Sequence, residues 1–172
     1  MQVLLEHLTD LRVIEAEFYL CLQIAQLVAA IEAQNAENGG MSEADIVALD
    51  KKWRAEVGSS ATPTIDPVLT GAVADLLRTY RDDSAGLFTE IFVMDSVGLN
   101  VAASDTTSDY WQGDEAKWQQ SYATGAQGIH ISDVDLDEST QIYQAQVSVA
   151  ITDGAGSPIG AATFGVNVEN LE

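Results

Sequence analysis

Five amphipathic side chains that could hold a small organic molecule lie close together in the middle of the chain. Aromatic rings with polar tips can form the walls of a ligand pocket, and a lysine can pair with a carboxylate. Within the thirteen positions 110–122 the sequence has Tyr110, Trp111, Lys117, Trp118 and Tyr122. We predict a ligand site here, with Lys117 holding an anionic group. A tryptophan at helical spacing can equally belong to a core, and for Trp118 both alternatives stay open.

Two further residues, His130 and Tyr143, are candidates for the same site. His130 alternates with Ile129 and Ile131 in a segment typical of a strand, so its side chain faces away from theirs. It could line the pocket or be a surface or satisfied strand residue, and the sequence leaves both open. Tyr143 would add another flat wall with a polar tip.

The acidic run 133–138 resembles the opening of a calcium-binding loop but departs from it at two positions. Counted from Asp133, the sixth position is Glu138, where the loop needs a glycine, and the twelfth is Gln144, where a bidentate glutamate is expected. We interpret the run as an acidic surface loop and predict no metal site.

The sequence lacks the familiar catalytic patterns. The chain has two histidines, His7 and His130, and a single cysteine, Cys21, which lies between two leucines in a helical pattern typical of a buried thiol. It has no Gly-x-Ser-x-Gly elbow, no phosphate-binding loop with Gly-Lys-Ser/Thr and no His-Glu-x-x-His. We therefore expect neither an enzyme nor a cofactor.

Five segments have the composition of strands, and their spacing indicates an antiparallel sheet. The first two form a hairpin around the turn 95–98, and the last two are joined by the Gly-rich link 153–156. A short helix around 115–122 separates the first two strands from the other three. We predict an α+β fold with a five-stranded antiparallel sheet that has this helix near one face and the long N-terminal helix on the other. The expected strands are 89–94, 99–103, 129–134, 141–152 and 157–168.

The N-terminal third has helical periodicity. Asn38-Gly39-Gly40 ends a first long helix, and Ser42 with Asp45 resembles a capping box for a second helix that runs to about Glu56. Gly58 to Thr64 is a linker. Asp66-Pro67 starts a third helix that is expected to reach about Tyr80.

Two apolar stripes run along the first helix at the same period. Both could serve one core, or one could pack on the sheet and the other on a second copy of the helix, and these alternatives are left open. A homodimer through this helix is the partner that the second alternative implies. One stripe, interrupted by Glu15, has Leu4, Leu8, Leu11, Phe18, Leu22, Ala25 and Ala29, and the other has Ile14, Cys21, Ile24, Val28 and Ile31.

Composition limits the possible partners. Seven Lys and Arg against 27 Asp and Glu give a formal net charge of -20, which opposes association with nucleic acid or anionic lipid. The acidity is typical of a soluble protein or a saline habitat, and it could also attract a cationic ligand. The sequence has no run of about 18 apolar residues and no signal-peptide pattern.

With these elements in order, the chain resembles the Cache domains, the PAS-like, PDC-type extracytoplasmic sensors of chemoreceptors and sensor kinases. The resemblance covers roughly residues 66 to 168. It rests on FVMDSVGLNVAAS for the first hairpin, DYWQGDEAKWQQSY for the pocket helix, and ISDVDLDES followed by VSVAITDGAGSPIGAATFGVNV for the closing hairpin. It implies a ligand-sensing domain without catalysis, placed on the periplasmic side of a membrane and normally flanked by membrane helices.

The resemblance also carries expectations for the ligand. Amino-acid-binding members typically have an arginine and a Trp-Tyr pair in the pocket helix and an aspartate near the end of the last strand. Here the similar places have Lys117, Trp118-Gln119 and Asn167, which argues against an amino-acid ligand. If Asp133 or Asp135 points inward, the resemblance allows one of them to meet an amine of the ligand. A small organic solute, carboxylate or amine, is the expected partner.

We therefore divide the chain into an N-terminal helical region, residues 1–65, and a PAS-like Cache sensor domain, residues 66–172. The predicted function is that of the small-molecule sensor of a transmembrane receptor, such as a chemoreceptor, kinase or cyclase. The alternative is a dimerisation or interaction module whose pocket is vestigial and filled by its own side chains.

Overall fold

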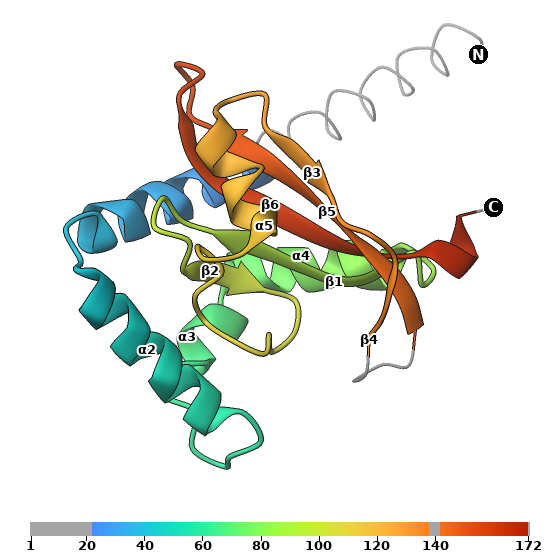
Figure 1. Ribbon diagram of the computed structural model, residues 1–172, viewed down its shortest axis with the longest axis horizontal. Helices are drawn as coiled ribbons and strands as arrows, with labels where there is room; N and C mark the ends of the chain where they lie inside the picture. Colours follow the sequence, from blue (N-terminus) through green and yellow to red (C-terminus); the bar gives the residue numbers. More distant parts are fainter. Residues whose placement is uncertain (1–21, 138–141, 172) are drawn as a thin grey trace, which may run out of the picture.

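A computed structural model describes residues 22–137 and 142–171 of the chain (Figure 1). Several residues that the sequence singled out lie outside this part. They are His7, Cys21 and the positions Leu4, Leu8, Leu11, Ile14, Glu15 and Phe18 of the first helix.

The centre of the fold is a six-stranded antiparallel sheet in the order β2-β1-β6-β5-β3, with β4 also paired to β5. The predicted α+β class is confirmed. The sheet has one strand more than expected because the edge continues past the predicted strand 129–134: β3 ends at Ile131, and β4, at residues 135–137, pairs with a different part of the long strand β5. The strands are β1 (Phe88–Met94), β2 (Asn100–Ala103), β3 (Ile129–Ile131), β4 (Asp135–Asp137), β5 (Ile142–Thr152) and β6 (Pro158–Asn167).

The helices begin and end largely where local signals place them. The first helix ends at residue 38, before Gly39 and Gly40, and α2 (Glu43–Glu56) begins with the predicted capping box between Ser42 and Asp45. The expected third helix is instead two, α3 (Asp66–Leu69) and α4 (Ala72–Asp83). Gly71 separates them with a φ of 99°, a left-handed conformation that a helix cannot include. The remaining short helices are α5 (Ala116–Gln119), η1 (Tyr122–Thr124) and η2 (Val168–Asn170).

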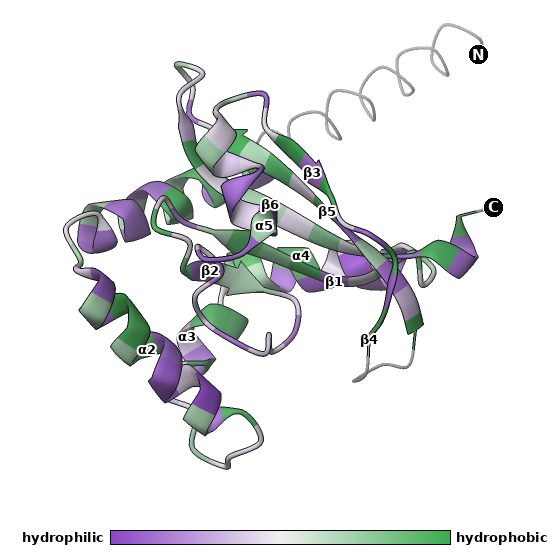
Figure 2. Ribbon diagram, viewed as in Figure 1, coloured by the Kyte–Doolittle hydropathy of each residue, from purple (hydrophilic) through white to green (hydrophobic). Residues whose placement is uncertain are grey.

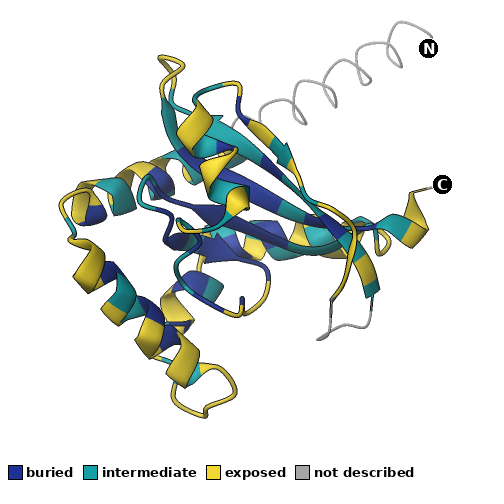
Figure 3. Ribbon diagram, in the orientation of Figure 1, coloured by how far each residue is buried: buried dark blue, intermediate teal, exposed yellow. Residues whose placement is uncertain are grey.

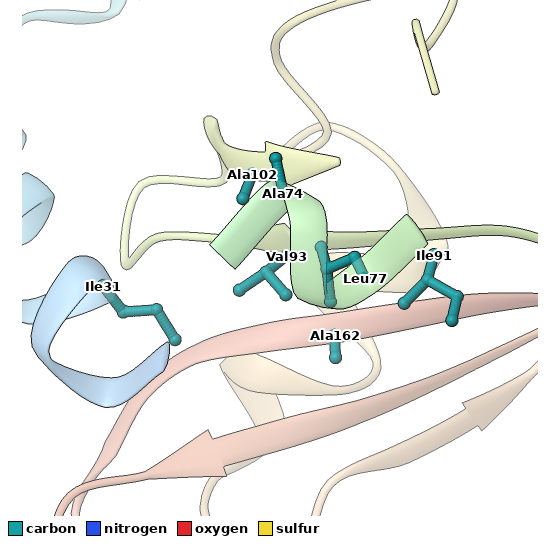
Figure 4. Packing of buried hydrophobic residues seen from close by; sticks show 7 residues of the cluster. All are labelled: Ile31, Ala74, Leu77, Ile91, Val93, Ala102 and Ala162. Carbon is teal, nitrogen blue, oxygen red and sulfur yellow. The ribbon is translucent and has the colours of Figure 1, made fainter. Parts of the chain in front are cut away.

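One face of the sheet is covered by α4 and the first helix. Ile31 and Leu77 project onto the strands and pack with Ile91 and Val93 of β1 and Ala162 of β6 (Figure 4). Each of these side chains is at most 6% exposed. Burial of a large aliphatic side chain contributes about 1.5 to 3 kcal/mol, so this layer is a main source of stability.

The opposite face is covered by α5, η1 and α3. Phe92 and Met94 alternate with Ile91 and Val93, so they point to this second face. Trp118 and Tyr122 pack against the buried cluster that contains Phe92 and Met94. The prediction that the 115–122 helix and the first helix lie on opposite faces is therefore confirmed.

The predicted division at residue 65 stays a prediction. Trp53 of α2 and Ile65 belong to the same buried cluster as Phe92, so hydrophobic contacts cross that position. Figure 2 shows apolar residues concentrated in the central strands, and Figure 3 shows the same strands buried, whereas α2 is exposed along much of its length.

Candidate ligand-binding site

An open pocket of about 870 Å³ lies on the α5 side of the sheet, toward the β4 end. We call it the acidic pocket. Its floor is formed by Glu90 of β1 and by Gln144 and Gln146 of β5, and its walls are the loop 106–108 and the segment 132–136. Glu90 and Gln146 are both ladder partners of Gly165, so they lie on the same face of the sheet. Glu90 is two residues from Phe92 in β1, and because side chains alternate along a strand, this is the face that Phe92 and α5 share.

The electrostatics of the acidic pocket favour a cation. Glu90, Asp133 and Asp135 contribute carboxylates, and none of the described residues that line the pocket is Lys or Arg. Gln146 Nε2 donates to Glu90 Oε1 at 3.1 Å, which holds the floor in place. The formal net charge of -20 adds a negative field over the whole molecule.

The predicted aromatic residues form a second region on the same face, beside the acidic pocket. We call Tyr110, Trp111, Lys117, Trp118 and Tyr122 the aromatic group. Its indole nitrogens are already bonded within the chain: Trp111 Nε1 donates to the carbonyl of Val97 at 2.9 Å and Trp118 Nε1 to that of Asp95 at 3.1 Å. The Trp118 and Tyr122 rings are 5.0 Å apart in a tilted contact. These side chains stabilise the fold in the structure described.

Lys117, the predicted partner of a ligand carboxylate, has partners of its own. Its Nζ lies 2.9 Å from Glu115 Oε2 and donates to Gln112 Oε1 at 3.0 Å. It also lies 5.4 Å from the centre of the Phe92 ring, within cation–π range. With its side chain 13% exposed, the ammonium is partly buried and neutralised by Glu115.

The aromatic group and the pocket wall are held by α2. Trp53 is fully buried, stacks on Tyr110 at 5.1 Å between ring centres, and donates from Nε1 to the carbonyl of Thr107 at 2.8 Å. Asp50 Oδ1 accepts from the backbone N–H groups of Tyr110 and Trp111. Burial raises the pKa of Tyr110 to about 12, with smaller contributions from the charges of Asp95 and Glu37.

A chain of polar contacts extends this support to Lys117. Arg54 pairs with Asp50 at 2.7 Å and with Asp109 at 3.2 Å, and the hydrogen bond that it donates to Asp50 raises the pKa of the guanidinium. Asp109 then accepts from Gln112 Nε2 at 2.6 Å, and Gln112 accepts from Lys117. The sequence analysis missed Asp50, Trp53 and Arg54. Asp50 and Arg54 pair within α2, but their contacts to the aromatic group and the pocket wall, like that of Trp53, lie more than fifty positions away, so no local pattern marks them.

The remaining candidates lie in different places. Asp133 and Asp135 line the acidic pocket, as an inward placement requires. His130 is the ladder partner of Ser148 and therefore faces the α5 side, although the pocket lining does not include it. Tyr143 pairs with Leu136 and is adjacent in β5 to Gln144, so it lies on the opposite face with 51% exposure. Its position differs from the predicted one.

Two general findings complete the site. Within residues 22–137 and 142–171, no three His, Cys, Asp or Glu side chains come together as metal ligands. In the same part of the chain, no helix is both long and apolar enough to cross a membrane.

No family model matches the sequence, and no curated protein matches it. Solved structures do resemble it. The extracellular domain of rpHK1S-Z16, described as a histidine kinase, has a TM-score of 0.47 and 15% identity over 90% of this chain and 59% of that one. The ligand-binding domain of the Pseudomonas aeruginosa PAO1 amino acid chemoreceptor PctC, in complex with GABA, has a TM-score of 0.46 and 15% identity over 91% and 63%.

The ligand-binding domain of the Campylobacter jejuni chemoreceptor Tlp3, in complex with 4-methylisoleucine, has a TM-score of 0.44 and 14% identity over 87% of this chain and 60% of that one. The chain thus spans about three fifths of the length of these three domains. They are extracellular or ligand-binding domains of signalling proteins.

Proposed function

We propose that the chain is an extracytoplasmic sensory domain that binds a small organic amine in the acidic pocket. The observation that carries this proposal is the open pocket on the sheet, with carboxylates in its floor and walls. The exposed hydroxyl groups of Thr106 and Ser108 supply further acceptors for an ammonium group. A volume of about 870 Å³ is sufficient for a small metabolite.

The arrangement favours an amine over a carboxylate. A carboxylate that approached Lys117 would compete with Glu115 for the same ammonium, and Gln112 already accepts another of its protons. A carboxylate that entered the acidic pocket would meet three acidic side chains, Glu90, Asp133 and Asp135. A cation meets the opposite situation, because both the pocket and the whole molecule attract it.

A pair of probes with equal carbon chains and opposite charge tests this proposal. Thermal unfolding is followed with cadaverine and with glutarate, and any ligand that binds only the folded state raises the melting temperature. We expect cadaverine to stabilise the domain and glutarate to leave it unchanged. Stabilisation by glutarate alone would reject the amine and restore Lys117 as the ligand's partner.

We further propose that the domain belongs to a membrane receptor and forms a homodimer through its first helix. In the described part of the predicted seam, Leu22 is 44% exposed, and Ala25 and Ala29 are also exposed. In the neighbouring stripe Ile31 is fully buried on the sheet, whereas Ile24 is 52% exposed, so a second copy of the helix could cover the exposed residues Leu22 and Ile24 together. Leu11→Asp should make the protein monomeric in sedimentation while the sheet stays folded. A wild-type monomer at high concentration would contradict the dimer.

A second function, that of an interaction module, has one specific observation in its favour. Ile129 and Ile131 of the edge strand β3 are each 65% exposed, and farther along the same face Tyr143 of β5, the ladder partner of Leu136, is 51% exposed. Exposed apolar groups at a sheet edge are typical of protein contacts. This alternative predicts that no small molecule raises the melting temperature and that Ile131→Lys abolishes self-association.

A further inference from the structure

The turn between β1 and β2 contains a buried carboxylate that the proposed ligand site does not use. Asp95 is fully buried. Its Oδ1 accepts from the backbone N–H groups of Val97 and Leu99, each at 2.9 Å, which closes the turn 95–98. Its Oδ2 accepts from the side-chain amides of Gln34 and Asn38, also at 2.9 Å each. One carboxylate therefore joins the turn to the last part of the first helix.

The first helix makes two further bonds around the same turn. Asn35 Oδ1 accepts from the N–H of Ser96 at 2.7 Å, and Asn35 Nδ2 donates to the carbonyl of Ile159 at 2.7 Å. Gln34 Nε2 also reaches the carbonyl of Asn100 at 3.2 Å. Three side chains within five positions of one helix are thus committed to the β1–β2 turn and its surroundings.

The other side of the turn is in contact with the aromatic group. Trp118 Nε1 donates to the carbonyl of Asp95 itself, and Trp111 Nε1 to that of Val97. Gly98, with a φ of 87°, accepts from the N–H of Gln112 at 2.7 Å. A Cβ on Gly98 would lie 2.4 Å from Gly113 Cα, so the two backbones are in direct contact. The turn is therefore packed directly against the segment 111–113.

We propose that the turn 95–98 transmits displacements of α5 to the first helix, with Asp95 as the positioning residue on which both sides converge. A shift of Trp118 moves the Asp95 carbonyl, and because the Asp95 carboxylate is bonded to Gln34 and Asn38, the helix end moves with it. Hydrogen bonds to a carboxylate are short and directional, which makes such a link stiff. The acidic pocket reaches this turn through its wall, because Thr107 and Gln112 both donate to the Asp109 carbonyl and the Gln112 N–H donates to Gly98. The link deepens the proposed function and rests on it, since a sensor must pass occupancy of its pocket to another element.

A ligand-free experiment tests the link. Trp118→Phe removes the bond to the Asp95 carbonyl and keeps an aromatic ring. Gln34→Ala with Asn38→Ala removes both helix bonds to the Asp95 carboxylate and leaves the two turn bonds of Asp95 and the Asn35–Ser96 bond in place. Hydrogen exchange of the amides of residues 31–38 is measured for Trp118→Phe in the wild-type and in the Gln34→Ala/Asn38→Ala background. Asn38→Ala alone serves as the background if the double variant does not fold.

We expect Trp118→Phe to accelerate exchange at these amides about three-fold in the wild-type background and to have a smaller effect in the second background, where the Asn35–Ser96 bond still joins the turn to the helix. Trp53→Phe is the matched control, because it removes an indole bond to a carbonyl outside the turn. Its effect should be the same in both backgrounds. An effect of Trp118→Phe that is absent, or equal in both backgrounds, would overturn the link. Since no ligand is used, that result would leave amine binding to the thermal-unfolding experiment.

Discussion

The aromatic group and the acidic pocket share one face of the sheet but differ in how far their polar atoms are used within the chain. Trp111, Trp118 and Lys117 have the side chains best suited to ligand recognition, yet each has a partner in the fold. Asp133 and Asp135 lie exposed at the open pocket. The comparison teaches that recognition chemistry in a sequence marks a binding site only where the fold leaves that chemistry free.

The largest expected effect tests whether the aromatic group is structural. Trp53→Ala removes a fully buried ring that stacks on Tyr110 and bonds Thr107, and it should lower the free energy of unfolding by about 3 to 5 kcal/mol. Urea unfolding measures the loss. Trp53→Phe keeps the stacking and should lose only about 1 kcal/mol. A loss below about 1 kcal/mol for the alanine variant would show that α2 does not hold this region.

A second effect of burial in the aromatic group should be visible at alkaline pH. The pKa of Tyr110 is about 12 in the folded protein and 10 ordinarily, so the unfolded chain loses this proton first. Stability from Tyr110 is therefore complete below pH 10 and falls as pH rises through 12, by about 2 kcal/mol.

The alkaline effect can be assigned by substitution. Tyr110→Phe should reduce the fall in unfolding free energy between pH 9 and 12, whereas Tyr143→Phe, at an exposed tyrosine, should leave it unchanged. Identical profiles for wild type and Tyr110→Phe would contradict the burial of this phenol.

In the acidic pocket, substitutions should change the affinity for the ligand and leave the melting temperature unchanged. Asp133→Asn combined with Asp135→Asn should weaken cadaverine binding about ten-fold in titration calorimetry, with a melting temperature close to that of the wild type. Asp83→Asn combined with Glu32→Gln removes two exposed carboxylates from α4 and the first helix, which cover the opposite face, and is the control for total charge. Equal effects of both changes would mean that the general field, and not the pocket, attracts the amine.

The smallest effect on binding is expected at Lys117. Lys117→Met keeps an apolar stem over Phe92 but removes the ion pair with Glu115, so cadaverine affinity should change less than about two-fold. An anionic ligand held by Lys117 would instead weaken at least about thirty-fold in Lys117→Ala. Titration of both variants with cadaverine and glutarate decides whether the aromatic group also binds ligand.

Much of the fold could be predicted because its signals are local. The turn 95–98, the β5–β6 hairpin and the capping box at Ser42 depend on residues within a few positions of one another. The break at Gly71 and the division of the edge into β3 and β4 were missed. The helical pattern of 66–80 continues through the glycine. The two edge strands are distinguished only by the part of β5 with which each one pairs.

The sequence by itself determined the α+β class, the hairpins, the assignment of the first helix and the 115–122 segment to opposite faces, and the acidic character of the chain. Tertiary structure decided which polar groups remain available. Trp118 and Asp95 bond to partners up to 61 positions away, Lys117 lies over the ring of Phe92, and Asp133 and Asp135 line the same pocket as Glu90 only when β4 and β1 join one sheet. Side-chain types are written in the chain, but whether a hydrogen bond is satisfied depends on contacts between segments that no local pattern specifies.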